Sequence, residues 1–364
     1  MLTKKKTNRP GKRVLMRCDG APEIGLGHVV RCLALADELR DEYCCEVAFA
    51  MLEGIVAIEQ IQEHGYVVHQ SAGGVCKTID EGAWLHQLVM DTETHALILD
   101  VRTNLTLDAV QKIRANNVLI VTIDDSSERR LAADLVFYPP VPQVEKLGFS
   151  GFSGQLFVGW DWVLLRPEFA LHRMKVSPIN SISNVKNGQP EPLKVLVTMG
   201  ASDPACLTVL TLKALHKIDR NLHVIVVLGR EFMHESALHQ WMNKVRRNYD
   251  FRRDIDDMPS IMAEAHIAIA SFGVTAYEIA VIGVPAIYLC LTDDHALSAR
   301  AFCDANIASS LGCYKSVKPL DIENAIMELL QDGRKRSRMS RNARLIIDGK
   351  GVKRVASTII SKIS

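Results

Sequence analysis

The stretch VLMRCDGAPEIGLGHVVRCLALADEL, residues 14–39, decides the fold that we expect for this chain. It opens on the run Val14-Leu15-Met16-Arg17-Cys18, which is typical of a short strand. A glycine-containing loop follows, and from His28 to Leu39 apolar residues recur at helical spacing. A strand, a loop and a helix in this order predict one βα unit of a parallel sheet.

The same alternation continues along the first half of the chain. Further expected strands are 47–50, 96–99 and 118–123, and expected helices include 55–63 and 107–115. Residues 177–192, SPINSISNVKNGQPEP, have no amphipathic period and are rich in Ser, Asn and Pro, which indicates a linker. The alternation restarts after this linker, with expected strands 193–198, 224–228, 267–270 and 286–289, a turn at 200–204 and a helix at 207–218.

We therefore predict an α/β protein with two Rossmann-like domains that face each other across a cleft, each opening with a strand, a loop and a helix. The expected boundaries are an N-terminal domain over 12–176, the linker over 177–192, a C-terminal domain over 193–340 and a C-terminal helix over 341–364 that packs back on the first domain. Ligands of such folds bind at the carboxyl ends of the strands.

The composition limits the classes of function. A length of 364 residues is enough for two domains, and a formal net charge of +1 gives no general field for nucleic acid or anionic lipid. The nine cysteines are scattered without a C-x-x-C pair, which favours reduced core cysteines over disulfides or zinc. No signal peptide or membrane span is predicted, so we expect a cytoplasmic protein with no stable membrane insertion; its oligomeric state is left open.

The first candidate site is the loop that ends in Gly25-Leu26-Gly27-His28. Its glycines allow the backbone to approach a ligand, and the helix that starts near His28 offers free N–H groups. A histidine there is suited to proton transfer near neutral pH. Arg31 lies one turn later on the same helix face and could contact an anion. A capping role for His28 and a structural ion pair for Arg31 are equally open interpretations.

The second candidate site, Ser271–Glu278, follows an expected strand and opens a helix. Backbone N–H groups at Gly273–Thr275 suit a diphosphate, and Glu278 could accept hydrogen bonds from ribose hydroxyls. Alternatively, Thr275 caps the helix and Glu278 completes a T-x-x-E capping box.

The third candidate site is Thr292-Asp293-Asp294-His295, just beyond an expected strand. The two carboxylates and the histidine suit a site, or they are turn residues that start the next helix. Ile123-Asp124-Asp125 likewise ends a strand, where a capped loop is the simpler interpretation. We expect no metal ion, because no further ligand cluster is visible, and no cofactor.

Several motifs together resemble the family of pseudaminic acid biosynthesis hydrolases that act on UDP-2,4-diacetamido-2,4,6-trideoxy-β-L-altropyranose, and equally the related spore-coat polysaccharide proteins. The motifs that carry this resemblance run nearly end to end: DGAPEIGLGHVVRCLALADEL from Asp19, IDD from Ile123, LLRPEF from Leu164, VTMGASDPACLT from Val197, SFGVTAYEIAVIGVPAIYLCL from Ser271 and GKGVKRV from Gly349. The resemblance implies a glycosyltransferase-B (GT-B) type fold, metal-independent cleavage with inversion, and release of UDP.

The resemblance also implies roles for individual residues. It assigns to His28 the activation of the water that attacks the anomeric carbon, and to Glu278 a contact with the nucleotide. The expected residue sets are catalytic His28, Asp19, Gly27 and Asp294; nucleotide-binding Ile255, Met258, Gly273, Val274, Thr275 and Glu278; and sugar-binding Gly25, Arg31, Arg102, Asp293 and His295.

Three positions depart from the family pattern. Asp293-Asp294-His295 stands where Asp-Asn-Gln is usual, Val101-Arg102 replaces a pair with an active-site tyrosine, and Tyr138-Pro139-Pro140 replaces a polar end with an asparagine. These departures affect the expected identity of the sugar more than the expected fold or reaction class. Hydrolysis of a UDP-linked diacetamido sugar is the leading interpretation; the alternatives are an inverting glycosyltransferase and a binding protein without catalysis.

Overall fold

The computed structural model describes residues 11–20, 27–71, 80–175, 185–186, 189–245, 248–253 and 255–363. The chain divides into two compact units. Unit 1 comprises Met1–Tyr138, Gly148–Phe157 and Val352–Ser364, and unit 2 comprises Pro139–Leu147 and Val158–Gly351. Residues 158–176, expected in the first domain, therefore group with the second, and most of the last helix groups with the first.

Unit 1 is a seven-stranded sheet in the order β3-β2-β1-β4-β5-β6-β7, with parallel pairing from β3 through β6. Its strands are β1 (Arg13–Cys18), β2 (Glu46–Met51), β3 (Val67–Gln70), β4 (Ala96–Asp100), β5 (Leu119–Ile123), β6 (Leu135–Tyr138) and β7 (Gln155–Val158). Its helices are α1 (Gly27–Tyr43), α2 (Ile55–Glu63), α3 (Glu81–Asp91), α4 (Leu107–Arg114) and α13 (Gly351–Ile360). A short 3₁₀ turn of unit 1 is η1 (Glu128–Ala132), whereas η2 (Pro142–Lys146) and η3 (Trp160–Trp162) belong to unit 2.

Unit 2 is a six-stranded sheet in the order β12-β11-β10-β13-β14-β15, with every neighbouring pair parallel. Its strands are β10 (Leu193–Thr198), β11 (Leu222–Leu228), β12 (Asp250–Arg253), β13 (Ile267–Ser271), β14 (Ala286–Cys290) and β15 (Ala308–Cys313). Its helices are α5 (Pro167–Lys175), α6 (Leu207–Lys217), α7 (Glu235–Met242), α8 (Met258–Glu264), α9 (Val274–Ile282), α10 (Asp293–Asp304), α11 (Pro319–Gln331) and α12 (Gly333–Ile346), with a 3₁₀ turn η4 (Tyr314–Ser316). A hairpin of β8 (Val185–Lys186) and β9 (Gln189–Pro190) falls in the expected linker.

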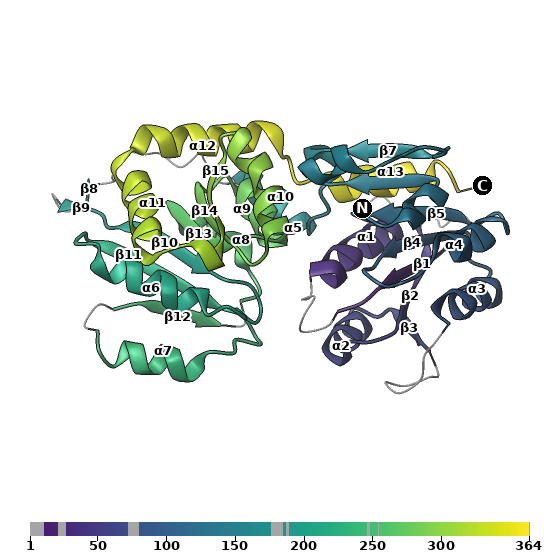
Figure 1. Ribbon diagram of the computed structural model, residues 1–364, viewed down its shortest axis with the longest axis horizontal. Helices are drawn as coiled ribbons and strands as arrows, with labels where there is room; N and C mark the ends of the chain where they lie inside the picture. Colours follow the sequence, from purple (N-terminus) through teal and green to yellow (C-terminus); the bar gives the residue numbers. More distant parts are fainter. Residues whose placement is uncertain are drawn as a thin grey trace, which may run out of the picture. The chain divides into compact units, whose positions relative to one another are not determined.

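In each sheet, strands are added first on one side of the unit's first strand and then on its other side. Each sheet therefore has one topological switch point, which lies between β1 and β4 in unit 1 and between β10 and β13 in unit 2 (Figure 1). Loops diverge to opposite sides of a sheet at such a point, which leaves a crevice at the carboxyl ends of its two strands. The predicted α/β class with two Rossmann-like domains is confirmed. None of the described helices is long and apolar enough to span a membrane.

The strands at both switch points are buried on both faces, as expected for parallel sheets covered by helices. β4 and β13 have no exposed residue, and β1 exposes only its first residue in part. This burial fixes the ends of the strands, from which the candidate site residues project.

Candidate active site

The switch point of unit 1 brings together two side chains from distant parts of the sequence. Asp100 is the last residue of β4, and His28 is the second residue of α1, which follows β1. Because β1 and β4 are paired neighbours, Nδ1 of His28 lies 2.6 Å from Oδ1 of Asp100. The Asp100 side chain is 1% exposed and that of His28 is 15% exposed, so the imidazole is the member of the pair that a ligand can reach.

Arg31 holds the Asp100 carboxylate from the other side. Its Nε lies 2.6 Å from Oδ2 of Asp100, and one of its terminal nitrogens lies 2.5 Å from Oδ1. Burial alone would raise the pKa of Asp100, but the guanidinium of Arg31 and the imidazole of His28 hold it well below its usual range. Asp100 is therefore ionised at neutral pH.

The charge of Asp100 determines the tautomer of His28. An ionised carboxylate only accepts hydrogen bonds, so the 2.6 Å contact requires the proton to be on Nδ1 of His28. Neutral His28 then carries its free lone pair on Nε2. A terminal nitrogen of Arg31 lies 3.1 Å from Nδ1. This arrangement leaves Nε2 available to accept a hydrogen bond from a ligand.

Asp124 continues the network along the same sheet edge. It follows β5, adopts a left-handed backbone conformation with φ 52°, and its Oδ2 lies 3.7 Å from Arg31 and 2.9 Å from Arg102. Arg102 also donates to the Asp124 carbonyl at 2.6 Å. The Arg102 side chain is 41% exposed, and two of its five N–H donors are used in these bonds.

A buried arginine fixes the loop that carries Arg102. Arg129 donates to the carboxylate of Asp125 at 2.7 Å and to the carbonyls of Val101, Thr103 and Leu105 at 2.6, 2.8 and 3.2 Å. Its side chain is 2% exposed. One guanidinium thus ties the loop after β4 to the loop after β5.

Asp19 has a bridging position. It forms an ion pair with Arg17 at 2.6 Å and accepts from the backbone N–H of Leu52 at 2.9 Å and of Glu53 at 3.4 Å. It therefore links the loop after β1 to the loop after β2. Gly27 is the first residue of α1, and Gly25 lies outside the described residues.

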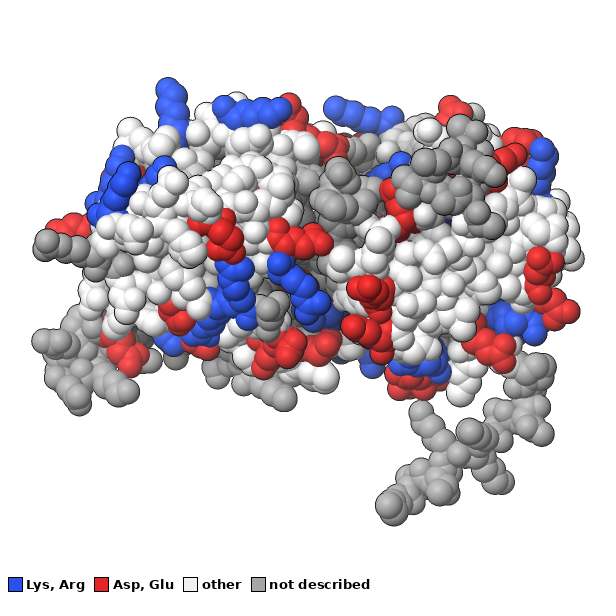
Figure 2. Space-filling model, turned by 90° about the horizontal axis from the view of Figure 1, so that it is seen from below, with Lys and Arg blue, Asp and Glu red and all other residues white. Residues whose placement is uncertain are grey.

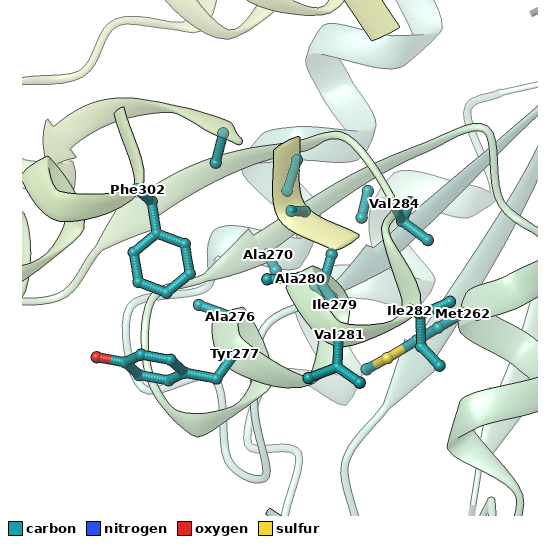
Figure 3. Packing of buried hydrophobic residues seen from close by; sticks show 14 of the residues in the cluster. Met262, Ala270, Ala276, Tyr277, Ile279, Ala280, Val281, Ile282, Val284 and Phe302 are labelled. Carbon is teal, nitrogen blue, oxygen red and sulfur yellow. The ribbon is translucent and has the colours of Figure 1, made fainter. Parts of the chain in front are cut away.

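In unit 2, Glu278 lies on α9, a helix that is buried on nearly all sides. Figure 3 shows the packing of apolar residues of α9 and its neighbours, including Tyr277 and Phe302, whose ring centroids are 4.9 Å apart. Burial raises the pKa of Glu278 to about 7, although Arg166, 3.7 Å away, favours the ionised form. A carboxylate poised in this way is typical of functional sites.

The start of α9 differs from the capping alternative. Gly273 occupies the N-cap position and makes no side-chain cap, so the interpretation of Thr275 as the N-cap of a capping box is wrong. Thr275 is the second helical residue, after Val274. The Cβ position of Gly200, in the turn after β10, is 3.5 Å from Oγ of Ser271, so the two loops of this switch point are in contact.

The third candidate cluster forms the first turn of α10. Thr292 is the N-cap and accepts from the N–H of His295 at 3.1 Å, so Asp293 opens the helix. Asp294 accepts from the side-chain amide of Gln143 at 2.9 Å. The turn interpretation of these residues is thus confirmed.

The two residues expected to border the base, Ile255 and Met258, are partly buried against the core around α9. Met258 opens α8, where Asp257 accepts from the N–H of Ser260 at 3.1 Å. In the described part of the chain, no group of three or more His, Cys, Asp or Glu side chains is arranged to hold a metal ion.

Three functional candidates were missed in the sequence: Asp100, Arg166 and Gln143. Asp100 had a usable signal, because an acidic residue ends a strand of only apolar residues. Arg166 and Gln143 contact their partners over 112 and 151 positions of sequence, and no local pattern marks them.

Comparison with known proteins agrees with this architecture. Residues 194–359 match the family model of the glycosyltransferase family 28 C-terminal domain. The chain is 23% identical over 345 residues to the spore coat polysaccharide biosynthesis protein SpsG of Bacillus subtilis, over 94% of this chain and 96% of that protein. It is 27% identical over 283 residues to an uncharacterized protein of Methanocaldococcus jannaschii, over 76% of this chain but only 55% of that longer protein.

Two solved structures share the fold at low sequence identity. MurG of Acinetobacter baumannii has a TM-score of 0.69 at 16% identity, over 96% of this chain and 99% of that chain. The UDP complex of S. aureus MnaA has a TM-score of 0.63 at 14% identity, over 96% of each chain. The chain thus shares its fold with these two structures, is similar to SpsG over nearly its whole length, and resembles the glycosyltransferase family 28 C-terminal domain over residues 194–359.

Proposed function

We propose that the protein is an enzyme that cleaves the anomeric C–O bond of a UDP-linked sugar with inversion and releases UDP. The observation that carries this proposal is the His28–Asp100 pair at the switch point of unit 1, whose geometry leaves Nε2 of His28 as a base. The attacking oxygen in the leading form of the proposal is that of water.

The base acts on the attacking oxygen. Nε2 of His28 takes the proton as the oxygen bonds to the anomeric carbon, on the face opposite the departing UDP. Asp100 stabilises the imidazolium that forms, and its pairing with Arg31 keeps the carboxylate ionised throughout. Proton transfer from a positioned base of this kind contributes about 10²- to 10⁴-fold to the rate.

The nucleotide is assigned to unit 2. In the proposal Glu278 accepts hydrogen bonds from the ribose hydroxyls, the N–H groups of Gly273–Thr275 bind the diphosphate at the start of α9, and Ile255 and Met258 border the uracil. The match of residues 194–359 to a glycosyltransferase domain and the UDP bound by S. aureus MnaA support this assignment. UDP leaves as a stabilised anion, so no strong general acid is required.

Each unit has candidate contacts for the sugar. Within the described part of the chain, Arg102 bonds only Asp124, which leaves N–H donors for acetamido or hydroxyl oxygens, and Asp293, Asp294 and His295 supply acceptors and a ring. The sequence motifs favour a diacetamido-trideoxy sugar, made for nonulosonic acid or surface polysaccharide. The homology to SpsG supports the polysaccharide setting.

Transfer of the sugar to an alcohol is the second candidate, and the glycosyltransferase domain favours it. The role of His28 is the same, because removing a proton from water or from an alcohol is one kind of step.

One experiment tests the proposal and separates the two acceptors. The purified chain is incubated with a panel of UDP-sugars, including diacetamido-trideoxy sugars, without an acceptor, and UDP release and the product anomer are followed by NMR. Stoichiometric UDP release with inversion, lost in His28→Ala, supports hydrolysis. Release only after an alcohol is added supports transfer. Bound UDP-sugar that is never cleaved, with or without acceptor, contradicts both.

A further inference from the structure

Helix α12 has a one-sided charge pattern that the proposed reaction does not use. Its sequence GRKRSRMSRNARLI contains no acidic residue, and its basic residues are Arg334, Lys335, Arg336, Arg338, Arg341 and Arg344. Arg336 is turned inward and donates to the carbonyls of Leu329 and Leu330 at the end of α11. An inward-facing arginine of this kind stabilises the fold. The basic residues on the outer face of α12 need a different explanation.

The outer face carries three arginines at intervals of four and three residues, Arg334, Arg338 and Arg341, which places them on one side of the helix. Among the described residues, no carboxylate pairs with any of the three. Like charges at this spacing destabilise a helix, so the pattern is unfavourable unless something neutralises it.

A cavity of about 320 Å³ lies beside this face. Lys335 and Arg338 of α12 line one side, and Ser309 and Ser310 of β15 line the other; the Ser310 hydroxyl also accepts from the N–H of Gly312 at 3.2 Å. Ala308 and Met339, both buried, add an apolar surface. The volume is at the lower end of the range for small-molecule sites.

The walls of the cavity are held in place by the fold. β15 is an edge strand of the sheet. Asn342 of α12 donates to the carbonyls of Ala305 and Asn306, just before β15, at 3.5 and 3.3 Å. Lys335 pairs at 2.6 Å with Glu328, whose side chain is 60% exposed, and such a surface pair is readily exchanged for a ligand.

We propose that this cavity binds the phosphate group of an organic phosphate ester. The two cations Lys335 and Arg338 match the oxygens of a phosphate, and the apolar surface accepts the carbon part of the ester. None of the lining residues belongs to the proposed catalytic, nucleotide or sugar sets, so this is a second site.

The local charge differs from the rest of the surface. The net charge of the whole chain is +1, and Figure 2 shows acidic and basic side chains interspersed on the face that it presents. A general positive field therefore does not account for an anion at α12. The ligand is recognised by these particular groups, either in a soluble phosphate ester or in a phospholipid headgroup.

The test uses the full chain and three probes: inorganic phosphate, glycerol 3-phosphate, and phosphatidylcholine vesicles with or without phosphatidylglycerol. Binding of the soluble probes is measured by calorimetry and that of vesicles by flotation. Arg338→Gln removes a lining cation, and Arg334→Gln is the matched control, because it removes an unpaired arginine of the same helix that does not line the cavity.

We expect Arg338→Gln to weaken binding by about tenfold or more, as for loss of a charge-assisted hydrogen bond, and Arg334→Gln to weaken it less than about twofold. Saturable binding of glycerol 3-phosphate identifies a soluble ester, and binding only to vesicles with phosphatidylglycerol identifies a headgroup. The proposal is overturned if no probe binds, or if the two variants lose binding equally. UDP release stays at the wild-type rate in Arg338→Gln, which separates this site from the proposed reaction.

Discussion

Nδ1 of His28 lies 2.6 Å from a carboxylate oxygen of Asp100, and the same carboxylate is held by two nitrogens of Arg31. The carboxylate therefore has a fixed charge and a fixed orientation before any ligand binds. Those two properties set the tautomer of the imidazole and direct its free lone pair outward. A base prepared in this way loses little energy to reorganisation during the reaction.

Replacing Asp100 by Asn is expected to lower kcat by about 10²- to 10⁴-fold with little change in KM, since the amide no longer fixes the Nδ1–H tautomer. Turnover is measured as UDP release, and UDP binding by calorimetry shows that the nucleotide site is intact. Asp108→Asn is the matched control, because Asp108 is a 71% exposed residue of α4 paired with Lys112. A kcat of Asp100→Asn equal to that of the control would remove Asp100 from the mechanism.

Most of the fold was predictable because strands and helices have different apolar periods. The expected strand 193–198 and helix 55–63 coincide with β10 and α2, and the expected helix 28–39 lies within α1. Short or half-exposed strands were missed, since β3 and β7 lack a continuous apolar run and expose both end residues.

The candidate site was only partly predictable. Arg31 was expected on the same helix face as His28, and its terminal nitrogen is 3.1 Å from the imidazole. The three-residue spacing of His28 and Arg31 along one helix is enough to predict that they are neighbours. The contact of His28 with Asp100 depends on the order of the strands in the sheet, and that of Glu278 with Arg166 joins residues that are far apart in the sequence. No local sequence pattern encodes either contact.

Replacing Arg129 by Met is expected to lower the free energy of unfolding by about 3–5 kcal/mol, because the buried carboxylate of Asp125 loses its partner. The double variant Arg129→Met/Asp125→Asn should be less destabilised than the single variant, since the unpaired charge is gone. Urea unfolding measures both. Arg114→Met is the control: its pair with Asp134 is partly exposed and is worth at most about 1 kcal/mol. Equal losses in Arg129→Met and Arg114→Met would contradict the buried-tie interpretation.

Glu278 is expected to make stability depend on pH. Its pKa is raised in the folded chain from 4.5 to about 7, so the folded state binds this proton more tightly than the unfolded state. The resulting stabilisation is fully present below pH 4.5 and is lost as the pH rises to 7, a change of about 3 kcal/mol. Glu278→Gln, which mimics the neutral form, should not show this loss when urea unfolding is compared at pH 4.5 and 7.5. The exposed Glu145→Gln serves as control and should follow the wild type; identical pH profiles for all three proteins would show that the pKa of Glu278 is not raised.

Gly54 lies where the loop after β2 meets the loop after β1, and its replacement by Ala is expected to disturb both stability and turnover. Gly54 has φ +105°, and a Cβ there would be 1.8 Å from the carbonyl oxygen of Gly20, next to Asp19. The clash must displace backbone, whereas Gly65, with φ +82°, has open space around its Cβ position. Gly65→Ala should therefore lower the free energy of unfolding only by the cost of placing an alanine in the left-handed conformation, about 1–2 kcal/mol. Its turnover should be normal. Gly54→Ala should cost more in urea unfolding and should also lower kcat, because the backbone that leads to His28 shifts. If the two variants were indistinguishable in both measurements, the loop contact would have no part in holding the site.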